Sequence, residues 1–397
     1  MKNKRITVIE ISHKLIKLVI GSVHEGSVIL HYSHKLPIEG LVESGIFIDI
    51  PSLLEKLLSI NPIHDEQFQI DELIDEAVIV VPPFGVEVYE TDQLTAVSSK
   101  EKIVGSHDIV NLYNIIANKK LPVDNDLIDI VPDAFFLANQ DRFAVPPIGK
   151  VSNTVVMKAR VLCIPGKINK QYTELFEKAG IKITHRVVST YALSELLATY
   201  EEIPHRYFLV DIGANASTVS LIGNKKLIAT RSFSFGGSTI TEKIISVFNV
   251  SEKDAESLKT LYGIDKREMH FDYAIVPAKE GSPARRNQDL NVVIEEALNK
   301  FATQLANAIT QIGESYKSNN FHELPIVITG GSSQLKGLLD HLKKALEKDN
   351  ISLAPLKVLG ARDPSLLAAL GAIYVHNKHS GVVEEINETI TPVSREE

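Results

Sequence analysis

The 397-residue chain has one cysteine, Cys163, and no tryptophan. A single thiol excludes an intramolecular disulfide framework and a cysteine-rich zinc site. Because Cys163 lies in the apolar, strand-like run VVMKARVLCI, we expect a buried core thiol. No run approaches the roughly 20 apolar residues that span a bilayer. The N-terminal MKNKRITVIEISHKLIK lacks the apolar core of a signal peptide, so we expect a cytoplasmic protein.

The chain also lacks a strongly basic block. Its net charge is −8, which argues against nucleic acid as the main partner. Hydrophobic residues make up 44% and charged residues 23%, as in ordinary globular proteins. At this length we expect two domains or one large bilobed unit.

Hydrophobic periodicity predicts the elements of the first half. Alternation in a period of two predicts three successive strands, and a helix and a buried strand follow. These elements span residues 6–10, 15–22, 27–34, 50–60 and 77–81.

A more polar stretch then interrupts the pattern and indicates an inserted subdomain. It contains a predicted helix, with Ser106 as its cap, and two strands. A further helix, ended by Gly180, resumes the main pattern. These four elements span residues 106–117, 126–131, 154–164 and 170–179.

The second half repeats the theme of the first, since each half opens with strand, turn, strand and an acidic residue at the first turn. We therefore infer an internal duplication. The predicted strands span residues 208–212, 217–222, 227–233 and 326–329. The predicted helices span residues 240–248, 252–261, 290–315, 335–347 and 364–375. The polar tail from His376 to Glu397 is predicted to be disordered.

The first candidate site is the hairpin over residues 8–17. Its strand carries Glu10 at its end, turns tightly and returns with Lys17. Such a turn can point backbone amides at a phosphate, and the lysine adds a compact positive charge. An ordinary edge hairpin with exposed charges is the alternative.

The second candidate has the same shape, with Asp211 at the end of a buried strand, then Gly213 and small hydroxylated residues. An aspartate here can hold Mg²⁺ through water, and Gly213 permits close phosphate approach. A glycine turn between antiparallel strands is the alternative. An apolar strand ending in an aspartate favours the functional interpretation, because a buried carboxylate needs a partner.

Two further segments complete the pattern. A strand over residues 326–329 delivers Gly330 and Gly331 to a helix start, where a base or a ribose–phosphate unit can be held. Glu256 and Lys259 share a helix face that can clamp ribose and adenine, with a surface ion pair as the alternative.

Taken in order, these motifs resemble the actin/Hsp70-like ATPase superfamily, and in detail the FtsA family of bacterial cell-division proteins. The segment GIFIDI over residues 45–50 is similar to that family's G-x-[IV]-[IV]-D-[IV] element. The segment AESLKTLYG over residues 255–263 is similar to its A-E-x-L-K-x-x-Y-G stretch, and IVP over residues 275–277 recurs in place. The resemblance covers the chain to about Val375.

This resemblance implies an α/β, actin-like (ribonuclease H-like, duplicated) bilobed fold with an FtsA-type subdomain 1C insertion. It implies subdomain 1A over residues 1–83 and 166–205, and 1C over 84–165. Subdomain 2A would span residues 206–245 and 324–376, and 2B would span 246–323. The disordered tail would span 377–397.

The implied cofactors are ATP and Mg²⁺. Asp211 is the implied catalytic residue, and Asp211 and Glu10 would hold Mg²⁺ through water. The implied nucleotide-binding residues are Glu10, Ser12, His13, Lys14, Lys17, Gly213, Ala214, Asn215, Ser217, Thr218, Gly236, Gly237, Glu256, Lys259, Gly330, Gly331 and Ser332.

The chain departs from the family at its phosphate loops. Glu10 replaces an aspartate and Ser12 a glycine, while Ala214 and Asn215 replace glycines. Ser12 narrows the room for a phosphate, so we expect ATP binding with weak or absent hydrolysis. The acidic tail also lacks the basic amphipathic helix with which the family usually reaches the membrane.

The resemblance implies a polymerising cell-division adaptor that forms filaments with itself. It would tether the tubulin-like protein FtsZ, with other division proteins, to the inner face of the cytoplasmic membrane, indirectly or through a segment not present here. A PilM-like adaptor of type IV pilus assembly, which shares subdomain 1C, is the alternative. A small-molecule kinase of the superfamily is a further one, but it needs a substrate-side base that the motifs do not supply.

Overall fold

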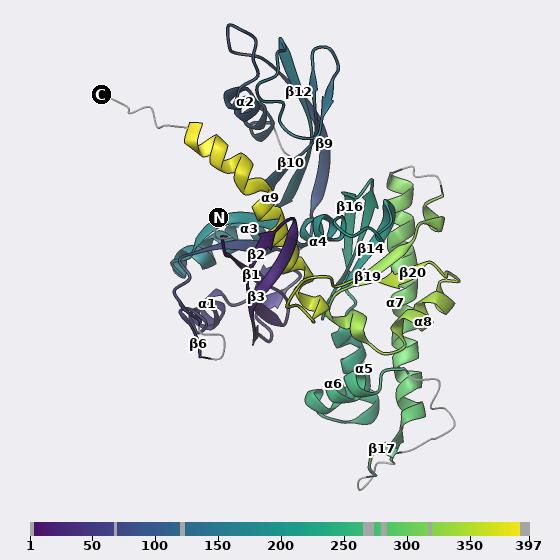
Figure 1. Cartoon of the computed structure of the whole chain (residues 1–397). Coiled ribbons are helices and arrows are strands. Elements are labelled where there is room, and N and C mark those ends of the chain that lie inside the picture. Colours follow the sequence, from purple (N-terminus) through teal and green to yellow (C-terminus); the bar gives the residue numbers. More distant parts are fainter. Residues whose placement is uncertain are drawn as a thin grey trace.

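The computed structural model describes residues 4–66, 70–119, 124–264, 274–278, 284–316 and 320–389. Two lobes lie side by side, each built on a five-stranded sheet. A separate four-stranded sheet extends beyond them at one end, while α5 and α6 lie toward the opposite end (Figure 1). No helix among these residues is both long enough and apolar enough to cross a membrane.

The first lobe is built on a meander of three antiparallel strands, followed by two strands that add in parallel, in the order β13-β8-β1-β2-β3. The central strand β1 is buried because the lobe covers both of its faces. The strands are β1 (Ile6–Ile11), β2 (Leu15–His24), β3 (Ser27–Pro37), β8 (Glu76–Val81) and β13 (Lys182–Val188). The helices are α1 (Ile50–Leu58), α3 (Gly166–Lys178) and α4 (Ser189–Leu197). Two small hairpins pair β4 (Val42–Glu43) with β5 (Ile46–Phe47), and β6 (Ile63–Asp65) with β7 (Ile70–Glu72).

The second lobe repeats this design in the order β16-β15-β14-β19-β20. Its meander is also antiparallel, and β19 and β20 add in parallel. The strands are β14 (Arg206–Ile212), β15 (Ser217–Gly223), β16 (Lys226–Phe233), β19 (Ile326–Thr329) and β20 (Ile351–Leu353). The helices are α5 (Gly237–Phe248), α6 (Glu252–Leu261), α7 (Asn287–Ser315) and α8 (Leu338–Ala345), and β17 (Ala274–Val276) pairs with β18 (Arg285–Arg286).

The two sheets therefore share one topology, which confirms the duplication inferred from the sequence. In each lobe the first strand of the hairpin pairs in parallel with a later strand, β1 with β8 and β14 with β19. The two hairpin turns are therefore equivalent, and they face each other between the lobes. The subdomain boundaries remain a prediction.

The inserted region forms a four-stranded sheet, of which the sequence predicted two strands together with the helix. Its strands run in the order β11-β10-β12-β9, with α2 (Ser106–Ala117) packed against them. The strands are β9 (Glu87–Ala96), β10 (Asn125–Leu137), β11 (Arg142–Phe143) and β12 (Thr154–Pro165). Cys163 is fully buried in this sheet, as predicted, and burial raises the pKa of its thiol to about 11.

The cap predicted for the insert's helix was wrong. Gly105, not Ser106, precedes the first turn of α2, and the Asp108 carboxylate accepts from the Gly105 amide (2.9 Å). A second Asp108 oxygen accepts from the Ser98 amide (2.9 Å). Asp108, in the first turn of α2, thus satisfies the Gly105 amide at the start of the helix and also ties the helix to residue 98.

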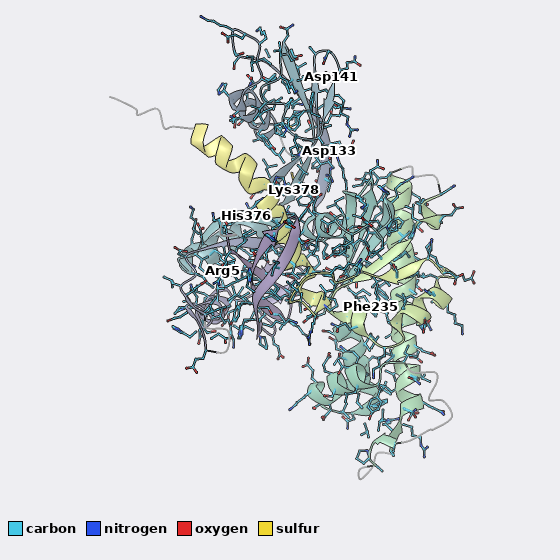
Figure 2. The ribbon with its side chains drawn as sticks, viewed as in Figure 1. Arg5, Asp133, Asp141, Phe235, His376 and Lys378 are labelled. Atoms are coloured by element: carbon cyan, nitrogen blue, oxygen red, sulfur yellow. The ribbon has the colours of Figure 1, made fainter. Side chains whose placement is uncertain are left out.

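The predicted disordered tail was wrong over its first part, because α9 (Leu367–Thr389) continues past Val375. Packing holds the added turn: the His376 and His379 rings lie 5.7 and 6.1 Å from the His185 ring, and Lys378 pairs with Glu195 at 2.8 Å. Figure 2 shows His376 and Lys378 between the first lobe and the insert. Residues 390–397 lie outside the described range.

Candidate functional site

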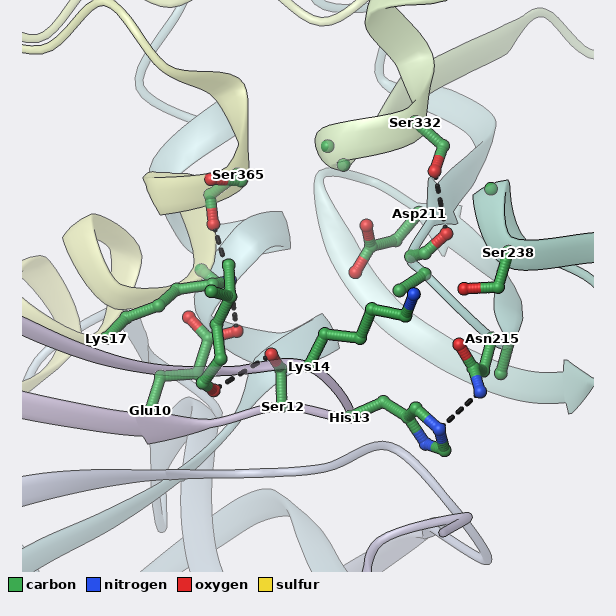
Figure 3. A pocket seen from close by; sticks show the side chains of 18 of the residues that line it. Glu10, Ser12, His13, Lys14, Lys17, Asp211, Asn215, Ser238, Ser332 and Ser365 are labelled. Carbon is green, nitrogen blue, oxygen red and sulfur yellow. Dashed lines mark hydrogen bonds and ion pairs between the residues drawn. The ribbon is translucent and has the colours of Figure 1, made fainter. Parts of the chain in front are cut away.

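A cleft of about 950 Å³ opens between the two lobes, with walls formed by the turns of both duplicated hairpins. The first hairpin brings Glu10, Ser12, His13, Lys14 and Lys17 to the cleft (Figure 3). The second lobe contributes three short loops, which follow β14, precede α5 and follow β19. A cleft of this volume accommodates a ligand of nucleotide size.

Glu10 and Lys17 form a buried ion pair on the first wall. They are direct partners in the antiparallel register of β1 and β2, and Lys17 Nζ lies 2.7 Å from Glu10 Oε1. Lys17 Nζ also donates to the Ser365 carbonyl (2.7 Å), just before α9. Glu10 Oε2 is buried without a hydrogen-bond partner. Lys17 is thus held by protein groups, and Glu10 keeps one acceptor oxygen available.

Ser12 closes its own turn. Its amide and its hydroxyl both donate to the Leu15 carbonyl, at 2.8 and 3.0 Å. The hydroxyl is therefore used within the hairpin, although the side chain still occupies space at the cleft wall.

His13 and Lys14 reach across the cleft to the second lobe. The His13 ring accepts from the Asn215 side-chain amide, and Lys14 Nζ lies 2.9 Å from Glu252 Oε1. Figure 3 shows both side chains extending toward the loops that carry Asp211 and Asn215. Burial, and then the Lys14 ammonium, lower the pKa of His13, which favours a neutral, accepting ring.

Hydrogen bonds fix the backbone of the second hairpin. The Gly237 amide donates to the Gly213 carbonyl (3.0 Å), and the Ser238 amide donates to the Ala214 carbonyl (2.8 Å). In a planar trans peptide the N–H points opposite to the C=O. The amides of Ala214 and Asn215 therefore point away from α5, within a loop that lines the cleft. Fixed amides of this kind can bind an anion.

Asp211 ends β14 at the floor of the cleft, opposite Glu10. Burial raises the pKa of its carboxyl to about 6; the Lys17 ammonium opposes this shift and the Glu10 carboxylate adds to it. Gly330 packs against Asp211, since a Cβ at this glycine would lie 2.3 Å from Asp211 Oδ1. The site thus holds a carboxylate in surroundings that favour a cation as its partner.

Glu256 and Lys259 form more than a surface pair. Lys259 Nζ lies 2.7 Å from Glu256 Oε2, and it donates to the Gly237 carbonyl (3.1 Å) and to Thr241 Oγ1 (2.9 Å). The pair joins α6 to the start of α5, and both residues line the cleft. Burial lowers the pKa of Lys259, and hydrogen bonding and charge from Glu256 oppose that shift.

The structure brings nearly all the predicted site residues to one cleft. The lining includes Asp211 and the predicted residues Glu10, Ser12, His13, Lys14, Lys17, Gly213, Ala214, Asn215, Thr218, Gly237, Glu256, Lys259, Gly330, Gly331 and Ser332. Whether they bind a nucleotide stays a prediction.

Two predicted residues are not in the lining. Ser217 is fully buried and its hydroxyl donates to the Phe235 carbonyl (2.7 Å), because successive strand residues face opposite sides of the sheet. Gly236 lies behind the second hairpin, where a Cβ would be 2.2 Å from the Ala214 carbonyl oxygen. Gly236 therefore allows close backbone packing without lining the cleft.

Several lining residues carry no motif and were missed. Ser365, Pro364 and Ala368 come from the start of α9 and its preceding turn, and Leu193 comes from α4. They reach the cleft only through tertiary packing. Sequence reasoning could have included Thr329, because it directly precedes Gly330. In the structure Thr329 pairs with Asp211 across the neighbouring strands β14 and β19.

Three buried polar atoms of the lining remain available to a ligand. Glu10 Oε2, Asn215 Oδ1 and Thr329 Oγ1 are all buried without a hydrogen-bond partner. The lining includes four lysines and five carboxylates, so it offers a polyphosphate no net positive charge. No group of three His, Cys, Asp or Glu in the described ranges is placed to hold a metal by itself. A magnesium ion here would thus need phosphate and water as most of its ligands.

Comparison with known sequences points to one family. The family model described as "Cell division protein FtsA" matches residues 208–371. Cell division protein FtsA of Bacillus subtilis (strain 168) is 24% identical over 380 residues, which cover 94% of this chain and 84% of that protein. Cell division protein FtsA of Escherichia coli (strain K12) is 21% identical over 98% of this chain and 94% of that protein.

Comparison with solved structures shows the actin-like fold. The PilM-PilN type IV pilus biogenesis complex gives a TM-score of 0.61 at 18% identity, covering 93% of this chain and 97% of that one. Ethanolamine utilization protein EutJ from Carboxydothermus hydrogenoformans gives 0.54 at 14% identity, over 94% and 90%. MreB 5 of Spiroplasma citri bound to AMPPNP gives 0.52 at 9% identity, over 98% and 99%.

Proposed function

We propose that this chain, a divergent relative of the cell-division protein FtsA, is an ATP-binding, filament-forming adaptor that links FtsZ to the cytoplasmic face of the membrane. The observation that carries the proposal is the pair of equivalent hairpins that face each other across the cleft, with Glu10 and Asp211 at its floor. The similarity to FtsA relatives over most of the chain supports the cell-division setting.

ATP would lie with its phosphates between the two turns. The fixed amides of Ala214 and Asn215 supply donors on one side, and the lysine of the opposite hairpin, Lys14, supplies charge on the other. Asp211 and Glu10 would hold the magnesium through water. Glu256 and Lys259 would contact the ribose and base from α6.

The first hairpin argues for binding with slow turnover. Lys17 is held by Glu10 and Ser365, and Ser12 occupies the space of the family's glycine. An adaptor needs the nucleotide to hold the lobes in one arrangement, and rapid hydrolysis adds nothing to that role.

Calorimetry of ATP with Mg²⁺ tests the binding, with wild type, Asp211→Ala and Asp340→Ala compared. We expect micromolar binding that Asp211→Ala weakens at least about tenfold, a loss of about 1.4 kcal/mol. Asp340→Ala is the control, because this aspartate is exposed on α8 and is not among the residues that line the cleft. Equal affinity for wild type and Asp211→Ala would contradict the proposed site.

Co-sedimentation with purified FtsZ polymers tests the partner, and electron microscopy with ATP tests filament formation. We expect saturable binding to FtsZ and ATP-dependent filaments. No FtsZ binding, together with capture of a short pilus-protein peptide by the insert, would favour a PilM-like adaptor, the alternative supported by the structural similarity to PilM. Turnover of sugars or acetate at ordinary enzyme rates would favour a kinase.

A further inference from the structure

The far end of the insert carries an unusual cluster of exposed apolar side chains. Ile103, Val145, Ile148 and Val151 are 42%, 68%, 43% and 71% exposed. They lie on two segments, residues 98–107 and 139–153, which meet at this end. Figure 2 shows Asp141, within the second segment, far from both lobes, whereas Asp133 on β10 lies near them. We call this surface the insert tip.

Backbone hydrogen bonds hold the two segments of the tip together. The Val104 amide donates to the Lys150 carbonyl (2.8 Å), and the Ser152 amide donates to the Lys102 carbonyl (2.8 Å). Ile103 and Val151 are direct partners of an antiparallel bridge. Side chains that are directly opposite in such a pair point to the same face. The two exposed side chains therefore form a defined surface.

The tip reverses the usual alternation of polar and apolar residues. Ser152 is buried, and its hydroxyl accepts from the Ala138 amide (3.0 Å) and donates to the Thr154 carbonyl (2.8 Å). Of the two consecutive residues Val151 and Ser152, the apolar Val151 is the exposed one. A strand that faces water normally presents polar side chains outward. An apolar surface with a satisfied polar residue beneath it indicates a binding role.

The net charge of the insert tip indicates which kind of partner it binds. The two segments contain four Lys or Arg and two Asp or Glu, an excess of two positive charges in a chain whose net charge is −8. The basic residues are Lys100, Lys102, Arg142 and Lys150, and all four are exposed. Exposed apolar side chains on segments with an excess of lysine and arginine match an anionic lipid surface, because the apolar side chains can enter the headgroup region and the basic ones can contact phosphates.

We infer that the insert tip docks on an anionic lipid membrane through Ile103, Val145, Ile148 and Val151, with the surrounding basic residues contacting the headgroups. This inference deepens the proposed adaptor function, on which it rests for its cellular setting, by assigning the chain its own lipid contact. It requires no nucleotide and no FtsZ.

Co-sedimentation of the purified chain with vesicles tests this contact. We expect binding to vesicles of phosphatidylcholine with about one-third phosphatidylglycerol, weakening in 0.5 M salt and on pure phosphatidylcholine, as for other electrostatic membrane contacts. The triple variant Val145→Ser, Ile148→Ser, Val151→Ser should bind at least about tenfold more weakly. Lys100→Glu with Lys150→Glu should remove the dependence on anionic lipid.

Leu73→Ser with Leu353→Ser is the matched control, since both leucines are exposed but lie outside the insert, Leu73 directly after β7 and Leu353 at the end of β20. It should bind vesicles like wild type. Thermal unfolding of every variant checks folding, and the tip variants should keep ATP and FtsZ binding, so failure here is distinguishable from failure of the adaptor role. No binding to anionic vesicles, or equal binding by wild type and the triple variant, would overturn the inference and leave the tip to a protein partner.

Discussion

Lys17 Nζ and Glu10 Oε1 lie 2.7 Å apart inside the cleft wall, where both side chains are about nine-tenths buried. The pair joins the two strands of the first hairpin, and through the Ser365 carbonyl it also joins the hairpin to α9. This wall of the cleft is therefore connected to α9, the helix that also contacts the insert.

Removal of one partner from this pair should destabilise the protein strongly. Lys17→Met leaves the Glu10 carboxylate buried and uncompensated, which typically costs about 3–5 kcal/mol. The double variant Lys17→Met, Glu10→Gln should recover most of that loss in urea unfolding. Lys14→Met, from the exposed pair with Glu252, should cost no more than about 1 kcal/mol. A Lys17→Met variant as stable as Lys14→Met would refute this interpretation.

Asp211 should make the unfolding free energy depend on pH. Its folded pKa of about 6 lies above the unfolded value of about 4, so the native state is penalised once the carboxyl ionises. The penalty is absent below about pH 4, grows up to about pH 6 and is complete above it.

Asp211→Asn should therefore raise the unfolding free energy at pH 8 by about 1–3 kcal/mol, and the gain should vanish near pH 4. Denaturation at both pH values measures the difference. Asp340→Asn, at an exposed site on α8, provides the comparison and should show no such step. A gain for Asp211→Asn that is the same at pH 4 and pH 8 would rule out ionisation as its cause.

Gly330 and Gly331 are adjacent, yet they should respond differently to alanine. Gly330 has φ +92°, and a Cβ there would lie 2.3 Å from Asp211 Oδ1. Gly330→Ala should cost about 1–3 kcal/mol of stability and impair ATP binding. Gly331→Ala should change stability little, since its Cβ makes an ordinary contact. Similar unfolding midpoints for the two variants would contradict the predicted strain.

Arg160 should anchor the insert to the second lobe. Its Nε donates to Asp133 within the insert (3.1 Å), and its Nη1 donates to the Leu227 carbonyl on β16 (2.7 Å). Arg160→Met should cost about 1–3 kcal/mol and speed amide exchange in β16, because it removes the buried donor to the Leu227 carbonyl and leaves Asp133 with Lys226 as its remaining ion-pair partner. Lys226→Met, which removes a more exposed contact to Asp133, should cost at most about 1 kcal/mol. Unchanged exchange in β16 of Arg160→Met would show that the insert is held elsewhere.

Local sequence determined much of the fold and of the site. Apolar patterning identified β1, β14 and β19, and Glu10, Asp211 and Gly330 lie at or directly after the ends of these strands. The repeated order of these strands also indicated the duplication. Both signals are local, because strand pattern and turn chemistry reside in consecutive residues.

The same reasoning failed where burial or exposure was uniform along an element, and where strand geometry decides which side chain faces the cleft. Helix α4 was missed because all of its residues are buried, so it has no polar face to reveal a helical period. Strand β9 was missed because most of its residues are exposed or half-buried at the edge of the insert. Ser217 was assigned to the site although strand geometry turns it away from Thr218, which does line the cleft.

The sequence by itself determined the two hairpins, their acidic residues and the order of the elements, since each depends on residues close together in the chain. Only the tertiary structure decided that Lys17 is held by Ser365, 348 residues away, that His13 meets Asn215, and that the insert rests on β16. These contacts arise when segments far apart in the chain pack together, and no local preference encodes which distant side chains then meet.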